Sequence, residues 1–108
     1  MKAFITGFAA AAGIALAGGA HAADSKAAEA LAKSSGCLAC HTLNKKTVGP
    51  AYKDIAAKYR GSKGAEADLI KKVKAGGKGV WGDIPMPPNV HVQDGDIKTM
   101  VQWILSIK

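Results

Sequence analysis

The sequence predicts a small all-α domain of about four helices that follows a short apolar leader. Three observations support this fold class. Four stretches combine helix-forming residues with helix caps or with apolar residues at helical spacing. Clusters of glycine and proline separate these stretches. No stretch shows the alternation of apolar and polar residues that is typical of a half-buried strand.

The leader has the features of an export signal. The chain begins with Met1 and Lys2, continues for 18 residues without a charge, and reaches Ala-His-Ala at residues 20–22, a sequence of the A-x-A type that signal peptidases cleave. We interpret residues 1–22 as a cleavable secretory signal peptide and residues 23–108 as the mature domain. A retained membrane anchor is the alternative, but the run is rich in Gly and Ala and is barely long enough to span a bilayer.

The first helix of the mature domain is predicted at residues 24–36. Asp24 or Ser25 can cap its N-terminus, and Gly36 can end it. Its apolar side is expected to consist of Leu31, Ala27 and Ala30.

Three more helices are predicted at residues 50–60, 65–77 and 94–108. The second helix starts with Pro50, whose fixed φ suits the first turn of a helix. The last helix has the clearest pattern, with apolar residues at i, i+3, i+4 and i+7: Ile97, Met100, Val101 and Ile104.

Two long loops separate these helices. Residues 37–49 contain turn-forming residues, and residues 76–93 are rich in glycine and proline, so we predict both as irregular. Loops of this length are unusual in a small domain and tend to carry function.

The mature domain is short of large apolar side chains. Removing 22 of the 108 residues leaves 86, and both phenylalanines are removed with the leader. A domain of this size buries only about 60% of the surface of its unfolded chain and is marginally stable without a staple. We therefore expect a bound group to complete the centre. The aromatic residues that remain are Tyr52, Tyr59, Trp81 and Trp103.

The main chemical motif is Cys-x-x-Cys-His at residues 37–41. A redox-active dithiol would normally lie beside a βαβ unit, which is not predicted here. Zinc is a poor fit because the adjacent Cys40 and His41 cannot easily reach one ion, and a disulfide between Cys37 and Cys40 would close a very small loop. The fourth possibility is c-type haem attachment, in which both thiols add to the vinyl groups of haem and His41 binds the iron.

A haem iron held by one histidine has a second axial position on the opposite face of the porphyrin. Met86 is the best candidate, because its thioether suits iron and three prolines stiffen the segment around it. Met100 is expected to be an ordinary core residue of the last helix. His91 is the rival ligand, although we expect it to be a partly exposed loop residue.

The stretches "CLACH", "VGPAYKDIAAKY", "GVWG" and "IPMPPN" resemble, in this order, the small bacterial class I cytochromes c of the c-551/c-552 type. The resemblance covers essentially the whole mature chain. It implies the class I cytochrome c fold, with about four helices around one covalently bound haem c. It also implies thioether links at Cys37 and Cys40, with His41 and Met86 as the axial ligands of the iron.

Three further roles are implied by the same resemblance. The carbonyl of Pro50 would accept a hydrogen bond from the His41 ring, Asn89 would orient the sulfur of Met86, and Trp81 would donate to a haem propionate. Family members often carry an arginine near a propionate, but the third predicted helix has Lys71 and Lys72 there.

The function that this resemblance implies is that of a soluble periplasmic one-electron carrier of a respiratory chain, and not of an enzyme. The alternative is a haem enzyme or gas sensor in which the sixth iron position is open. After loss of Lys2, 14 of the 15 basic side chains remain against 8 acidic ones, a net charge of +6. We expect a monomer whose lysines steer redox partners with acidic docking surfaces, and we expect neither nucleic-acid binding nor stable membrane insertion. The lysines concerned are Lys45, Lys46, Lys53, Lys58, Lys71, Lys72, Lys74 and Lys78.

Overall fold

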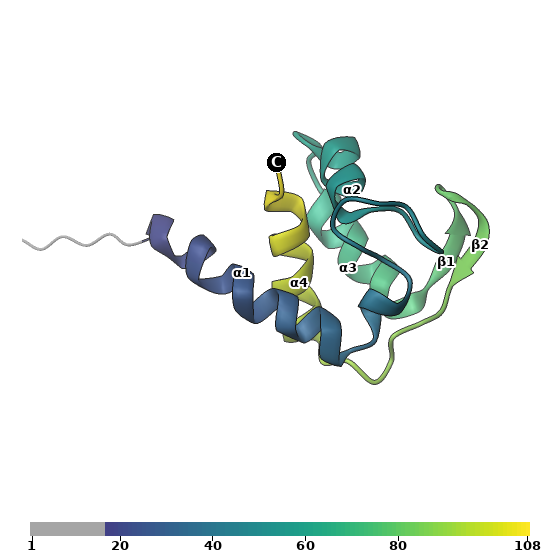
Figure 1. Cartoon of the computed structure of the whole chain (residues 1–108), viewed down its shortest axis with the longest axis horizontal. Helices are drawn as coiled ribbons and strands as arrows, with labels where there is room; N and C mark the ends of the chain where they lie inside the picture. The colour runs from purple at the N-terminus through teal and green to yellow at the C-terminus, as the bar shows by residue number, and fades with distance from the viewer. Residues whose placement is uncertain (1–16) are drawn as a thin grey trace, which may run out of the picture.

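The computed structural model describes residues 17–108, which form four α-helices, one 3₁₀ turn and a two-stranded hairpin (Figure 1). The interpretation of residues 1–22 as a signal peptide stays a prediction, because residues 1–16 lie outside the described part. The elements in chain order are α1 (Ala17–Ser34), η1 (Cys37–Ala39), α2 (Tyr52–Tyr59), α3 (Ala65–Ala75), β1 (Gly77–Gly79), β2 (Gly82–Met86) and α4 (Asp94–Ser106).

All four predicted helices of the mature domain are present. Helix α1 begins earlier than predicted, because Ala20, Ala22 and Ala23, which are good helix formers, directly precede residue 24. Its predicted apolar side was wrong at Ala27 and Ala30, which are exposed. Ala28 and Ala32, one helical turn apart, are the fully buried residues of this helix. With alanine at so many positions, composition does not distinguish the buried face from the exposed one.

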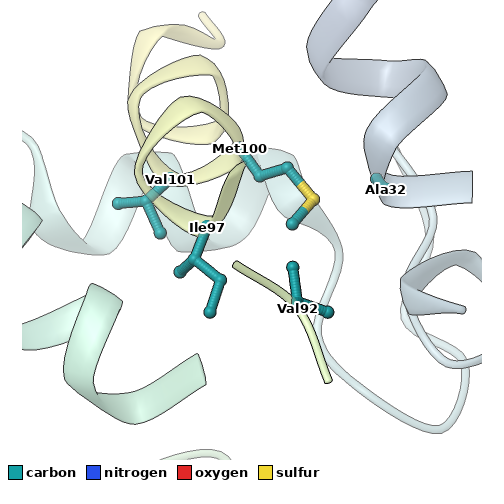
Figure 2. Packing of buried hydrophobic residues seen from close by; sticks show 5 residues of the cluster. All are labelled: Ala32, Val92, Ile97, Met100 and Val101. Carbon is teal, nitrogen blue, oxygen red and sulfur yellow. The ribbon is translucent and has the colours of Figure 1, made fainter. Parts of the chain in front are cut away.

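The C-terminal helix α4 is the centre of the fold and packs against α1, α2 and α3 (Figure 1). Its buried residues Ile97, Met100 and Val101 form one core cluster with Ala32 of α1 and Val92 of the preceding loop. Figure 2 shows Met100 reaching from α4 toward Ala32 and Val92. The prediction that Met100 is a core residue is therefore confirmed.

The prediction that residues 76–93 are irregular throughout was wrong. Strands β1 and β2 pair antiparallel, with Gly77 opposite Met86 and Gly79 opposite Gly82. Residues 77–85 are exposed, so the hairpin has no buried face and no alternating pattern that the sequence could reveal. The Cys-x-x-Cys stretch also differs from a plain loop, because Cys37–Ala39 form a 3₁₀ turn.

Within residues 17–108, no helix combines the length and the apolar character that crossing a membrane requires.

The packing of α4 predicts a large stability cost for truncating Ile97, the largest fully buried side chain among those described. We expect Ile97→Ala to lower the free energy of unfolding by about 2–5 kcal/mol, because the cavity left in the core is only partly refilled. Guanidinium chloride unfolding of the purified protein, followed by circular dichroism, measures the change. Lys98→Ala, at an exposed position of the same helix, should change it by less than about 0.5 kcal/mol. Equal losses in the two variants would contradict the assignment of the core.

Candidate functional site

A large cleft opens between the helices and the hairpin. Its empty volume is about 1140 Å³, with the open solvent at its mouth included. Most of its lining residues are apolar, and they come from segments far apart in the sequence. They include Cys37, Cys40, His41, Trp81, Ile84, Met86, Ile97 and Met100.

The first wall of the cleft carries the Cys-x-x-Cys-His motif. Gly36, in the left-handed conformation with φ 87°, lets the chain turn sharply after α1. The 3₁₀ turn follows, and the amides of Cys40 and His41 both donate to the carbonyl of Cys37, at 3.1 and 3.0 Å. This turn brings Cys37, Cys40 and His41 to the same cleft.

The Cys37 thiol does not have the character of the reactive thiol of a dithiol oxidoreductase. Both cysteines are free and partly buried. Burial raises the pKa of the Cys37 thiol, whereas dithiol oxidoreductases depend on a thiol whose pKa is lowered. Cys37 therefore does not supply the activated thiolate that the dithiol hypothesis requires.

The ring of His41 is held in one orientation. The side chain is only 9% exposed, and its Nδ1 lies 2.7 Å from the carbonyl oxygen of Pro50. Because a carbonyl only accepts, Nδ1 must carry the proton and donate. The lone pair is then on Nε2, which is the nitrogen left to bind a metal.

Two residues that sequence reasoning missed also fix this ring. A Cβ atom on Gly49 would lie 2.7 Å from Cε1 and 2.9 Å from Nδ1 of His41, so only glycine fits there. The ring of Tyr52 stacks on that of His41, with centroids 5.1 Å apart and planes 19° apart, and meets Trp103 edge-on at 5.5 Å. Burial raises the pKa of Tyr52, so its phenol stays neutral. The Gly49-Pro50 pair predicts a turn, but no local pattern shows which ring that turn contacts.

The loop that carries Pro50 is tied back to the motif. The hydroxyl of Thr47 and the amide of Gly49 both donate to the carbonyl of Cys40, each at 2.7 Å. At the end of the loop, the amide of Tyr52 donates to the carbonyl of Thr42 at 2.9 Å. These bonds fix the position of Pro50 relative to His41.

The hairpin also lines the cleft, and Met86 at the end of β2 is one of the lining residues. His91, the rival ligand, is exposed and does not line the cleft. Trp81 lines the cleft and is 39% exposed, with the ammonium of Lys58 5.8 Å from the centre of its ring. Lys72 also lines the cleft.

Asn89 lies just beyond the hairpin in the sequence. Its Nδ2 donates to the carbonyls of Val73 at 3.0 Å and Pro87 at 3.3 Å. These bonds attach the segment after Met86 to the end of α3. The expected role of Asn89 in orienting the sulfur of Met86 stays a prediction.

The residues of the cleft fit a haem. Two thiols, an imidazole with a free Nε2 and a thioether line the same cleft, together with many apolar side chains. Cysteine, histidine and methionine are the donors that c-type haems use. Within residues 17–108, no three His, Cys, Asp or Glu side chains are grouped to hold a bare metal ion.

The chain matches known proteins over most of its length. Residues 25–108 match the sequence model of the family described as cytochrome c. The chain is 58% identical to cytochrome c-552 of Hydrogenobacter thermophilus over 80 residues, which are 74% of this chain and 81% of that protein.

Solved structures agree with this match. The crystal structure of cytochrome c552 from Nitrosomonas europaea aligns with a TM-score of 0.72 and 54% identity, covering 74% of this chain and 99% of that one. A class 1 cytochrome from Sideroxydans lithotrophicus aligns with a TM-score of 0.64 and 37% identity, covering 76% and 94%.

The contact between Gly49 and His41 predicts opposite effects for two glycine substitutions. In Gly49→Ala the new methyl group would overlap the ring, and we expect the free energy of unfolding to fall by about 1–3 kcal/mol. In Gly95→Ala, in the first turn of α4, nothing lies within 4 Å of the new Cβ, and alanine favours the helix by up to about 1 kcal/mol.

Unfolding by guanidinium chloride compares these two variants with the original protein. NMR of the His41 Nδ1 proton adds a local measurement, because this proton should exchange faster with solvent in Gly49→Ala only. A Gly49→Ala protein with unchanged stability and unchanged exchange would show that Gly49 does not fix the ring.

Proposed function

Because the chain belongs to the cytochrome c family, we propose that it is a soluble periplasmic one-electron carrier whose haem iron is ligated by His41 and Met86. The single observation that carries this proposal is that both side chains line the same cleft as Cys37 and Cys40.

The cofactor and the fold follow from the family. The chain binds one haem c covalently, with its iron, and the Cys-x-x-Cys-His sequence at residues 37–41 is the attachment motif. The fold is the class I cytochrome c fold, as the sequence predicted. Members of this family carry electrons between redox partners.

A haem bound there supplies a one-electron couple between ferrous and ferric iron. The protein's part is to hold the ligands and exclude water. The Pro50 carbonyl keeps the proton of His41 on Nδ1, which strengthens the donor character of Nε2. The soft thioether of Met86 favours ferrous iron and thereby raises the reduction potential relative to that of a bis-histidine haem.

Ligation by His41 and Met86 also argues against an enzyme. If His41 and Met86 both hold the iron, it would have no coordination position left for oxygen, peroxide or a substrate. The alternative function, a haem enzyme or gas sensor, requires that Met86 not bind the iron. Its position in the cleft wall, in a segment that three prolines stiffen, favours the carrier.

Two further residues at the cleft are proposed to contact the propionates of the haem. Trp81 lines the cleft, and its indole N–H can only donate, which suits a carboxylate. Of the two lysines of α3 considered for the second contact, Lys72 lines the cleft and Lys71 is exposed. Lys72 is therefore the better candidate.

The expected partners are redox proteins with acidic docking surfaces in a respiratory chain. The excess of basic side chains favours transient encounters that depend on salt, over a small interface. Lys72 and Lys78 lie at the cleft itself, so part of this charge surrounds the site of electron exchange. We propose that the carrier is a monomer that binds no nucleic acid and has no stable membrane insertion.

The ligand assignment predicts a large spectral change in Met86→Ala. In protein matured in a host that attaches haem, we expect the original protein to be low-spin and its ferrous form not to bind carbon monoxide. The variant should have a lower reduction potential, and its ferrous form should bind carbon monoxide. Visible spectra of the oxidised and reduced proteins, with and without carbon monoxide, show the spin state and the binding of carbon monoxide, and a redox titration followed by the same spectra measures the potential.

Two control variants distinguish the loss of an iron ligand from a change in packing or in another candidate side chain. Met100→Leu alters the buried methionine of α4 with little change in volume and should keep the original spectrum. His91→Ala should keep it as well, because His91 lies outside the cleft. If Met86→Ala keeps the original spectrum and potential, the assignment of Met86 is wrong.

The proposed partners predict a rate that depends on charge. Lys78→Glu, at the cleft, should slow electron exchange with an acidic redox protein about two- to tenfold at low salt, and the difference should shrink above about 0.1 M salt. Lys26→Glu changes the net charge equally, but Lys26 is an exposed residue of α1 that does not line the cleft. Stopped-flow mixing measures both rates, and equal rates for the two variants would contradict docking at the cleft.

A further inference from the structure

The segment that links Met86 to α4 is attached to the last turn of α3. The amide of Asn89 donates to the carbonyls of Val73 and Lys74, both at 3.2 Å, and its side-chain Nδ2 donates to Val73 at 3.0 Å. The last carbonyls of a helix have no partner within the helix. Asn89 therefore caps α3, and the same contacts fix the start of the segment.

The other end of this segment is held by the packing of Val92 in the core and by one side chain of α3. The ammonium of Lys74 donates to the carbonyl of Val92 at 2.7 Å and lies 2.9 Å from Oδ1 of Asp94, the first residue of α4. The carboxylate of Asp94 is 82% exposed, so this ion pair contributes little by itself. The bond to the Val92 carbonyl is half-buried and comes from a charged donor, which makes it the stronger of the two contacts.

The lysines of α3 have different surroundings. Lys72 and Val73 line the cleft, whereas Lys74 does not and instead reaches the segment after Met86. Successive residues of a helix point about 100° apart, which explains why neighbours serve different surfaces. Lys71 is exposed and offers a matched residue of the same type on the same helix.

The backbone of Met86 also rests directly on the end of α3. Gly76 has φ 76°, and a Cβ atom there would lie 2.5 Å from the carbonyl oxygen of Met86 and 2.8 Å from the nitrogen of Pro88. On the other side, Met86 pairs with Gly77 in the hairpin. Met86 is thus fixed on its N-terminal side by the hairpin, and on its C-terminal side by the segment that Asn89 and Lys74 hold.

We propose that Lys74 is a positioning residue for Met86: by fixing Val92 and Asp94 to α3, its ammonium keeps the segment closed and the thioether in place at the iron. The inference rests on the proposed ligation by Met86. Loss of the Lys74 contacts leaves residues 90–93 held only by the packing of Val92 and by the contacts of Asn89, which loosens the segment and makes the thioether easier to displace.

The test is the affinity of the ferric holoprotein for cyanide, which must displace Met86 to bind. Lys74→Met keeps most of the aliphatic chain but has no donor, and we expect it to bind cyanide about tenfold more tightly than the original protein. Lys71→Met removes the same charge from an exposed position and should stay within twofold. Asp94→Asn removes only the ion pair and should change the affinity less than threefold.

The outcomes separate this inference from the proposed function. If Met86→Ala binds cyanide no more tightly than the original protein, Met86 is not the ligand, and the proposed function fails first. If Met86→Ala gains affinity but Lys74→Met and Lys71→Met bind equally, the ligand assignment stands and the role of Lys74 is wrong. Lower stability of Lys74→Met without a change in cyanide affinity would show a structural role only, and it would also overturn the inference.

Discussion

The chain has too few large apolar side chains to fill the space between its own helices, and the other parts of the fold depend on this shortage. Among the described side chains, Ile97 is the largest that is fully buried, and much of the remaining core is alanine. Larger residues such as Val80, Trp81 and Ile84 line the cleft and are at least 39% exposed. A flat apolar group completes this core, so the haem that carries the electron is also a large part of what the helices pack against. A group that binds only the folded chain stabilises it by mass action, and a covalent link makes that contribution permanent.

The two proposed iron ligands are held in different ways. His41 is fixed by contacts that are close in sequence: the Pro50 carbonyl, Gly49 and the ring of Tyr52 all lie within eleven residues of it. Met86 is fixed by contacts between segments, through the hairpin on one side and the end of α3 on the other. The first arrangement can form as soon as one loop closes, whereas the second requires α3, the hairpin and α4 to be in place together. Local opening of the fold therefore loosens the contacts that hold Met86 before it loosens those that hold His41.

The sequence predicted the helices because each has a local cause: a capping residue, a run of good helix formers or, in α4, a regular apolar spacing. It did not predict the hairpin, because a strand exposed on both faces leaves no alternating pattern and Pro85 argues against a strand. The residues of the site also divide into those that the sequence predicted and those that it did not. Residues 37–41 and Met86 could be chosen from their chemistry and their neighbours in the sequence. Gly49 and Tyr52 could not, because their effect on His41 exists only once the loop has folded back.

Helix α3 both lines the cleft and holds the segment that follows Met86. Lys72 and Val73 belong to the wall of the cleft, while the Val73 carbonyl and the Lys74 side chain hold the segment that follows Met86. Gly76 ends the helix and leaves the backbone of Met86 just enough room to lie against it. A shift of α3 would therefore move the cleft wall and the methionine segment together. Because one helix end carries both, the shape of the cleft and the position of the thioether are set by the same few contacts.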